Sequence, residues 1–335
     1  ELILNEDGFQ LDMEGFDKLM SQQKERSRQS SAFAAHQQDL HEFFALKEAH
    51  GETQFLGYDH LFAKGRLLGV LPWKDSKKAL VFDQTPFYAE SGGQVGDTGT
   101  VECNGQRLAV IDTVQPVEGL YAHLVEGDLS VQPGEAFDMQ VDAQRRRSVM
   151  MNHSATHLLH SALRQVLGSH VKQAGSLVAP DRLRFDFSHP EALSQAELFA
   201  VEGLVNEQIF AQIPASTQEM SKDEATRQGA LALFGEKYGS QVRTLRLGEF
   251  SFELCGGTHV RNTSEIQLFK LVSEQSLSSG VRRVEAVTGQ RALEFSQRRL
   301  DWFQQVQRQL AVSDEEVVAK VRELQSLLKQ KDRQM

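Results

Sequence analysis

Two pairs of potential metal ligands lie far apart in the chain, and they constrain its fold more than any other feature. His153 and His157 are four positions apart, so on a helix both imidazoles project from one face and can share a metal ion. Cys255 and His259 flank two glycines, which let the backbone curl both side chains toward one point. One thiolate and three imidazoles are a donor set that zinc prefers in a tetrahedral site. The fold must therefore bring a helix and a distant glycine-containing loop together.

Each pair also has a simpler interpretation. Two histidines four positions apart on a helix are often surface residues or hydrogen-bonded ones, and Cys255 could be a buried thiol beside a tight turn with an incidental histidine. His160 lies one turn further along the same helical face and is an alternative ligand. Taken together, the pattern predicts one Zn²⁺ ion held by His153, His157, Cys255 and His259.

Several helix boundaries can be read from capping residues. Asp142 can cap the helix that carries the histidines, and Gly168 can end it. Ser194, Ser221 and Ser313 each stand three residues before a glutamate, an arrangement in which the two side chains satisfy unpaired amides of a first helical turn. These positions predict three further helix starts.

The last of these helices has a regular apolar face. After Ser313, apolar residues recur at alternating steps of four and three positions, as in a coiled-coil seam. An ordinary amphipathic helix is the alternative, because only two heptads are visible. The seam residues are Val317, Val321, Leu324 and Leu328.

β-structure is predicted on both sides of the histidine helix. Residues 53–142 contain short β-branched and aromatic runs separated by Gly, Pro and Asn, which predict a small β-barrel or open sheet. Asn104-Gly105 between two runs predicts a type I′ hairpin turn. The predicted strands are Ala79–Asp83, Gly99–Cys103, Arg107–Val114, Tyr121–Val125, Gly175–Val178, Arg182–Phe187, Gln241–Leu247, Phe250–Leu254, Ile266–Val272 and Val281–Val287.

The remaining bulk properties narrow the class of protein. A long, weakly amphipathic helix is predicted over Asp12–Ala49, with Gly51 as its stop, and the fold class is α+β. With 335 residues, two or three domains are expected, and both ends suggest a piece of a longer polypeptide. We expect a cytoplasmic protein without a membrane span, and two cysteines are too few for a disulfide scaffold. A net charge of −10 means that nucleic acid could bind only at local basic clusters.

Long stretches of the chain resemble the editing domain of alanyl-tRNA synthetases and of their free-standing relatives. His-x-x-x-His followed much later by Cys-x-x-x-His is the hallmark of that family. Three further segments resemble its other motifs, and the resemblance as a whole covers nearly the entire chain. The resemblance implies a helical linker from an upstream tRNA-recognition region at 1–51, a small β-barrel domain at 52–142, a zinc-containing editing domain at 143–289 and the helical start of a C-terminal domain at 290–335. The matching segments are Thr85–Asp97, Arg182–Phe187 and Gly280–Gly289.

The function implied by this resemblance is hydrolysis of tRNA(Ala) that carries serine or glycine in error. A pocket that admits alanine cannot exclude the smaller glycine and rejects serine poorly, so a second, hydrolytic site is needed. The resemblance gives Thr156 a role in recognising a hydroxyl or positioning water, and Gln173 a role in orienting the aminoacyl ester. A longer parent protein would attach alanine with ATP at an upstream site and could be an oligomer.

Several alternatives stay open from the sequence. Four protein ligands fill a tetrahedral zinc site, which is typical of a structural ion, whereas a catalytic zinc keeps a position open. A free-standing editing factor or a non-catalytic tRNA-binding module are the rival functions. A zinc protease is excluded because Ser154 follows the first histidine where glutamate is required. The clusters that could contact tRNA phosphates are Lys77-Lys78, Arg145-Arg146-Arg147 and Arg282-Arg283.

Overall fold

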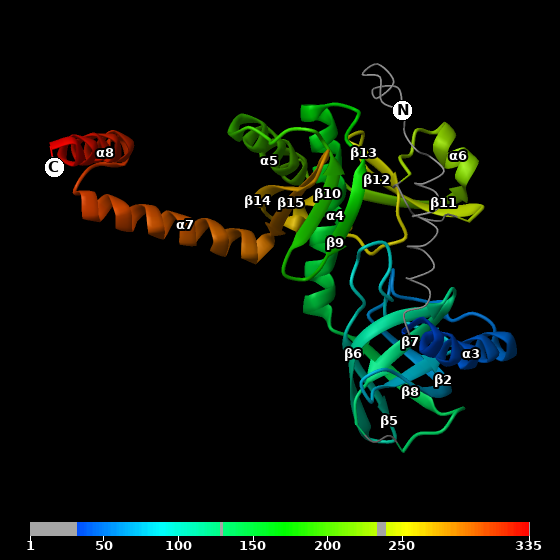
Figure 1. Ribbon diagram of the computed structural model, residues 1–335. Helices are drawn as coiled ribbons and strands as arrows, with labels where there is room; N and C mark the ends of the chain where they lie inside the picture. Colours follow the sequence, from blue (N-terminus) through cyan, green and yellow to red (C-terminus); the bar gives the residue numbers. More distant parts are fainter. Residues whose placement is uncertain (1–31, 128–129, 233–238, 335) are drawn as a thin grey trace, which may run out of the picture. The chain divides into compact units, whose positions relative to one another are not determined.

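The computed structural model describes residues 32–127, 130–232 and 239–334 of the chain. Contacts divide the chain into two compact units, of which the first holds residues up to 89 and 96–141, and the second holds residues 90–95 and those from 142 onward. Helices and strands occur throughout (Figure 1), which confirms the predicted α+β fold class. Among the described residues, no helix has the length and apolar character needed to cross a membrane.

The first unit is a closed barrel of six antiparallel strands in the order β2-β3-β7-β6-β5-β8, which confirms the predicted barrel. Side chains of β2 and β8 alternate between exposed and buried positions, as strands between a core and solvent require. Leu67, Phe82 and Phe137 are among the residues that fill the interior. The strands are β2 (Phe62–Pro72), β3 (Lys78–Phe82), β5 (Gly99–Cys103), β6 (Gln106–Val117), β7 (Leu120–Val125) and β8 (Ala136–Val141), with a short parallel pair of β1 (Gln54–Phe55) and β4 (Gln84–Thr85) beside them.

Helix α3 (Ala32–His50) precedes the barrel in the first unit. Its buried Phe43 belongs to a cluster that includes Ala79 and Leu120 of the barrel. Gly51 ends the helix at φ +81°, and its N–H donates to the carbonyl of Lys47 at 2.8 Å. The predicted helix and its stop are confirmed from residue 32 onward, and the part predicted before that residue lies outside the described residues.

The hairpin between β5 and β6 has the predicted turn. Asn104 and Gly105 both have positive φ angles, 51° and 78°, as a type I′ turn requires. Strand β2 was not identified from the sequence, because glycines and charged residues interrupt its apolar pattern. Gly65 explains one interruption, since a Cβ there would lie 2.7 Å from the carbonyl oxygen of Gln84 and 2.8 Å from the sulfur of Met139.

The central element of the second unit is helix α4 (Ala143–Leu167). The Asp142 side chain accepts the N–H of Arg145 at 3.0 Å, and the Gly168 N–H donates to the carbonyl of Arg164 at 3.0 Å. Both predicted ends of the histidine helix are therefore confirmed. Every residue in 151–160 is buried, although six of the ten are polar. Burying so many polar groups is costly unless each has a partner, so this stretch is a candidate for function.

Helix α4 packs against an antiparallel sheet in the order β14-β15-β10-β9 (Figure 1). Helix α5 (Gln195–Phe210) packs beside α4 and begins at the predicted capping box, in which Ser194 and Glu197 cap each other. Leu158, Phe185 and Val205 belong to the core that these elements share. The strands are β9 (Gln173–Val178), β10 (Leu183–Ser188), β14 (Phe269–Ser278) and β15 (Val281–Thr288).

A smaller antiparallel sheet, β11-β12-β13, carries the second pair of candidate ligands at its end. Its strands are β11 (Ala215–Ser221), β12 (Gln241–Leu247) and β13 (Ser251–Leu254), and helix α6 (Lys222–Arg227) follows β11. The Ser221 hydroxyl accepts the N–H of Glu224 at 3.2 Å, so a helix starts there as predicted. Strand β11 escaped sequence analysis because it is mostly polar and exposed.

One predicted strand begins too early. Ile266 belongs to the 3₁₀ turn η1 (Thr263–Ile266) rather than to a strand, and β14 starts at Phe269. The cause is a capping box, because Asn262 and Glu265 cap each other and start a helical turn.

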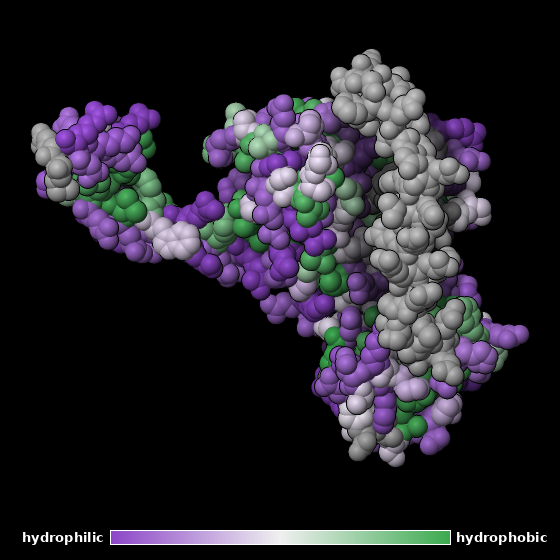
Figure 2. Space-filling model, in the orientation of Figure 1, coloured by the Kyte–Doolittle hydropathy of each residue, from purple (hydrophilic) through white to green (hydrophobic). Residues whose placement is uncertain are grey.

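The C-terminal segment consists of α7 (Gly289–Leu310), the turn η2 (Asp314–Glu316) and α8 (Val317–Gln334). The Glu316 carboxylate accepts the N–H and the hydroxyl of Ser313 at 3.0 and 2.7 Å, as predicted for a helix start. Val317 is buried, but Leu324 is 40% and Leu328 62% exposed. Figure 2 shows hydrophobic side chains at the surface of this segment. The helix is amphipathic with an unpacked apolar face, and the coiled coil stays a prediction.

Candidate metal centre

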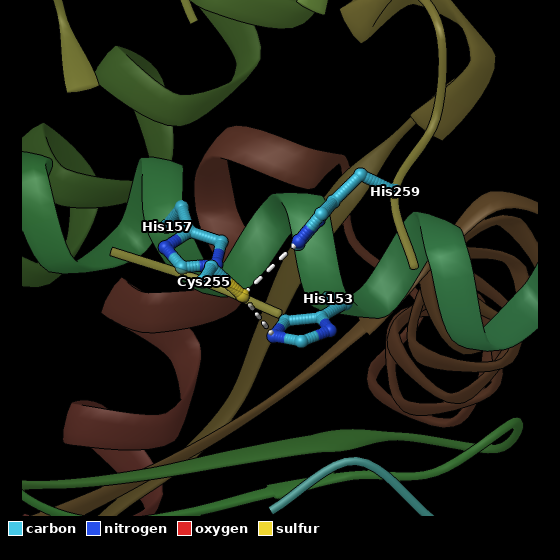
Figure 3. Close-up of side chains that lie close together, drawn as sticks. All are labelled: His153, His157, Cys255 and His259. Carbon is cyan, nitrogen blue, oxygen red and sulfur yellow. Dashed lines mark hydrogen bonds between the residues drawn. The ribbon is translucent and has the colours of Figure 1, made fainter. Parts of the chain in front are cut away.

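The four predicted ligands come together in the second unit. One ligand atom from each of His153, His157, Cys255 and His259 lies within 4.8 Å of the others, and all four residues are buried. Figure 3 shows the three imidazoles around the Cys255 sulfur, with two rings projecting from α4. The sulfur lies 3.2 Å from Nε2 of His259 and 3.5 Å from Nε2 of His153. A helix and a loop remote in sequence therefore meet, as the spacing predicted.

Each imidazole is held at its other nitrogen by a neighbouring oxygen. Nδ1 of His153 lies 2.7 Å from Oε1 of Gln94, and Nδ1 of His157 lies 2.5 Å from Oε2 of Glu253. Nδ1 of His259 lies 3.3 Å from Oγ of Ser154. Such partners fix the tautomer and orientation of metal-binding histidines, and they leave Nε2 as the ligand atom. Nε2 of His157 is buried and has no hydrogen-bond partner among the described residues.

The ionisation of Cys255 suits a ligand. Burial raises the pKa of its thiol, but the adjacent imidazoles of His153 and His259 outweigh burial and hold the pKa well below the ordinary value. The thiolate is the form that binds metals. Burial lowers the pKa of His259 to about 3, despite the opposing effect of the nearby Cys255.

His157 and Glu253 form a tightly coupled buried pair. Burial disfavours the charged form of each, but their mutual attraction prevails, with help from Cys255 at His157 and from His160 at Glu253. The pKa of His157 is raised to about 10 and that of Glu253 is lowered to about 2. A metal ion at Nε2 of His157 would have to displace a proton, so metal affinity here depends on pH.

The loop that carries Cys255 and His259 contains two glycines, and only one of them lies close against the other ligands. A Cβ on Gly257 would lie 2.1 Å from Cε1 of His153 and 2.9 Å from Oε1 of Gln94. A Cβ on Gly256 would meet nothing within 4 Å. Arg243 holds the same loop from the other side, because its Nη1 donates to the carbonyls of Cys255 and Gly257 at 3.1 and 2.9 Å. A side chain at position 257 would therefore collide with the ligand His153, so this position needs glycine.

Gln94 links the two halves of the cluster. It is fully buried, and its Oε1 accepts both from His153 and from the Thr258 N–H at 2.9 Å. Its Nε2 donates to the Thr258 hydroxyl at 2.9 Å. Gln94 closes a tight turn with Ser91, in which each N–H donates to the other residue's carbonyl. The segment Ser91–Gln94 therefore forms a turn and also supplies a buried amide to the site.

A cavity of about 230 Å³ is lined in part by residues of α4 and of the start of β9. The second carboxylate oxygen of Glu253 accepts from Nδ1 of His160 at 2.8 Å, so His160 is not one of the four clustered residues. His160 and Gln173 both line the cavity. Thr156 is buried on α4, and its hydroxyl donates to the carbonyl of Asn152 at 2.8 Å. That hydroxyl can still accept a hydrogen bond, because its lone pairs remain.

The basic clusters differ in their availability for phosphates. Arg146 is buried, so it does not reach solvent. Arg283 donates to both oxygens of Asp186 at 2.6 and 2.8 Å, and Nε of Arg282 donates to Glu274 at 2.6 Å. The charges of Arg282 and Arg283 are thus balanced inside the sheet. Phosphate contact stays a hypothesis for the other clustered residues, which are Lys77, Lys78, Arg145 and Arg147.

Sequence reasoning missed the residues that support the ligands. Glu253, Gln94 and Ser154 have no recognisable spacing relative to their partners. Gln94 lies within a segment noted only for its family resemblance, and Ser154 was noted only as evidence against a protease. Glu253 offered the clearest signal, since alternation along a strand places it and Cys255 on the same face.

Two family descriptions match parts of the chain. Residues 1–145 match "tRNA synthetases class II (A)", and residues 242–285 match "Threonyl and Alanyl tRNA synthetase second additional domain". The second range includes Cys255 and His259 and also Arg243 and Glu253, whereas His153 and His157 lie outside both ranges. The family match thus covers the loop side of the cluster.

Curated relatives match almost the whole chain. The alanine–tRNA ligase of Stenotrophomonas maltophilia is 47% identical over 99% of the chain, and that of Thermus thermophilus is 45% identical over 99%. The alanine–tRNA ligase of Fervidobacterium nodosum is 44% identical over 96% of the chain. The chain covers 38%, 40% and 38% of these three relatives, so it corresponds to about two fifths of their length.

Proposed function

The chain belongs to the alanyl-tRNA synthetase family, and we propose that it carries the editing reaction of such an enzyme, hydrolysing the ester bond of seryl-tRNA(Ala) and glycyl-tRNA(Ala). The observation that carries the proposal is the buried cluster of one cysteine and three histidines, in which an oxygen atom holds each imidazole. Glu253, which holds His157, also contacts His160, and His160 and Gln173 line a cavity. Residues buried at such cost serve a site rather than the core.

The ion we assign to this cluster is Zn²⁺. Three imidazoles and a thiolate form a donor set that zinc favours, whereas magnesium and calcium prefer oxygen ligands. The buried Nε2 of His157, which has no hydrogen-bond partner among the described residues, fits such an ion, because binding the metal would satisfy it once its proton is displaced. When bound, zinc supplies a Lewis acid or a charge that orders the surrounding residues. We further propose that the segments 1–51, 52–142, 143–289 and 290–335 are the domains of this region.

The chemical need for editing follows from the size of the amino acids. An activation pocket that accepts alanine also admits glycine and discriminates weakly against serine, whose extra hydroxyl is a small difference. Hydrolysis at a second site removes the wrong product. We propose that a longer parent protein attaches alanine to tRNA(Ala) at a separate, upstream site. The region described by this chain then receives the mischarged tRNA(Ala).

Thr156 and Gln173 are the residues proposed to contact the substrate, and of the two only Gln173 lines the cavity. The Thr156 hydroxyl donates to Asn152, so toward a substrate or water it can act only as an acceptor. Gln173 begins β9 and lines the cavity, where its amide can orient the aminoacyl ester through both a donor and an acceptor. Both assignments rest on the family resemblance together with these positions.

The test is deacylation of seryl-tRNA(Ala) by the purified chain, with and without a zinc chelator. We expect hydrolysis that the chelator abolishes and added zinc restores. Release of serine without loss on chelation would remove the metal from the proposal. Binding of tRNA(Ala) without any hydrolysis would identify a non-catalytic tRNA-binding module instead.

Replacing a ligand separates a catalytic ion from a structural one. Cys255→Ala is expected to lose both bound zinc and deacylation, because the thiolate is the only sulfur ligand. Cys103→Ala, in the barrel of the first unit, is the matched control and should keep both. Full activity of Cys255→Ala without bound metal would rule out a catalytic role for the ion, and circular dichroism would check that the variant is folded.

A further inference from the structure

One ring nitrogen of His160 forms no hydrogen bond with any described residue. The residue is 5% exposed, and its Nε2 is fully buried without a hydrogen-bond partner among the described residues. The same side chain lines the cavity of about 230 Å³ together with Gln173. A buried polar atom without a partner is destabilising. It therefore points to a group that enters the cavity and completes the hydrogen bond.

The contact with Glu253 determines what kind of group this is. Oε1 of Glu253 lies 2.8 Å from Nδ1 of His160, and an ionised carboxylate can only accept. The hydrogen bond with Glu253 therefore occupies Nδ1, and Nε2 is the ring nitrogen left for a further partner. A hydroxyl suits Nε2 as a partner, because a hydroxyl can both donate and accept a hydrogen bond.

The charges around the cavity disfavour a positively charged partner for His160. Arg164 and Lys172 line it beside His160, and Arg164 is held in place because its Nη1 donates to the carbonyls of Ser169 and Val171 at 3.0 and 2.9 Å. Two cations disfavour the entry of a third positive charge. A neutral hydroxyl is favoured over the ammonium group of an amino acid.

We propose that His160 is a specificity-determining residue whose Nε2 forms a hydrogen bond with a hydroxyl at the aminoacyl end of the substrate. This inference rests on the proposed deacylation. The hydroxyl has two possible sources, the serine side chain and the free hydroxyl of the terminal ribose. Glu253 connects this contact to the metal cluster, because one carboxylate holds both His157 and His160.

Two substitutions separate the two ends of the imidazole. His160→Asn keeps an amide near the position of Nδ1, so it can still contact Glu253 but presents nothing at the position of Nε2. His160→Gln places its amide near the position of Nε2 and gives up the contact with Glu253. The exposed His170, whose ring contacts His189, provides the matched control as His170→Asn.

We expect His160→Asn to lower kcat/KM for seryl-tRNA(Ala) by about 10- to 100-fold, the range for losing a hydrogen bond to a buried group. His160→Gln should recover part of this loss, and His170→Asn should match the wild type. Zinc content and thermal unfolding should be unchanged in His160→Asn. A loss confined to seryl-tRNA(Ala) assigns the serine hydroxyl, and an equal loss on glycyl-tRNA(Ala) assigns the ribose hydroxyl.

The opposite ranking would overturn the inference. If His160→Gln is more damaged than His160→Asn, the contact with Glu253 is what matters and His160 has only a structural role. An unchanged kcat/KM in His160→Asn would also exclude recognition by His160. Failure of the proposed function itself is recognised separately, because the wild-type chain would then release no serine at all.

Discussion

At the scale of single residues, the two glycines between Cys255 and His259 differ in whether their surroundings leave room for a side chain. Gly257→Ala is expected to weaken zinc binding by about 10- to 100-fold, because its Cβ would collide with the His153 ring and displace a ligand. Gly256→Ala should bind zinc like the wild type, because a Cβ there meets nothing. Competition with a chelating dye measures both affinities. Equal affinities in the two variants would contradict the steric account.

Gln94 provides a second test of how the ligands are held. Gln94→Met keeps the volume of the side chain but leaves the Nδ1–H of His153 and the N–H of Thr258 without acceptors. We expect zinc affinity to fall by about 10- to 100-fold, the usual cost of losing a partner of a ligand histidine. Gln290→Met, on α7, is the control, since the Gln290 amide donates to the Glu294 carboxylate at 3.0 Å. Unchanged affinity in Gln94→Met would show that His153 needs no support.

The candidate site was only partly predictable from the sequence. The four ligands could be found because zinc restricts the residue types and a helix restricts the spacing of His153 and His157. Gln94 and Glu253 could not, because any buried carbonyl or carboxylate oxygen can hold an imidazole. The fold alone brings Gln94 beside Thr258, which lies 164 positions away. Support for a ligand is set by tertiary structure, whereas the ligand is set by chemistry.

At the scale of elements, the barrel contains a buried histidine whose ionisation opposes folding in acid. Nδ1 of His123 lies 3.0 Å from the carbonyl of Leu80, and Nε2 lies 2.6 Å from the Thr85 hydroxyl. Burial lowers the pKa of His123 to about 4, although the contact with Leu80 raises it slightly. Between pH 6.5 and 4 the unfolded chain binds a proton that the folded barrel excludes, so stability falls as the pH falls through this window.

We expect this effect to cost the barrel about 2 kcal/mol of unfolding free energy between pH 7 and 5. His123→Gln should flatten the pH dependence in this range, whatever its stability at pH 7, because glutamine does not titrate. Urea unfolding followed by Trp73 fluorescence in a Trp302→Phe background measures the barrel, and His60→Gln, at an exposed position, is the control. An unchanged slope in His123→Gln would assign the acid sensitivity to other groups.

The elements themselves were predictable where local signals were strong. The caps at Asp142 and Gly168 and the turn at Asn104-Gly105 rest on interactions within a few residues, and all three are confirmed. Strand β2 depends on glycines that let the barrel wall pack closely, and β11 is polar because it is largely exposed. Such strands are defined by their neighbours, so no local pattern reveals them.

At the scale of the whole molecule, the chain separates into two units whose cores share no residue. The barrel is filled by the cluster around Phe82 and Phe137, whereas the cluster around Leu158 and Phe185 includes Cys255. The segment 90–95, which contains Gln94, is grouped by its contacts with the second unit, although the residues on either side of it belong to the first. The metal cluster and all partners of its imidazoles therefore belong to one unit.

Metal removal should consequently affect the two units differently. An ion that binds only the folded second unit stabilises it by about 4 kcal/mol when free metal exceeds the dissociation constant a thousandfold, which slows amide exchange there by about a thousandfold. Hydrogen exchange read by mass spectrometry should show that chelation accelerates exchange in α4 and in the loop between Cys255 and His259, while β3 and β7 keep their rates. Acceleration in β3 and β7 equal to that in α4 would instead mean that the two cores unfold together. Amides that exchange through one common opening respond equally to the loss of the metal.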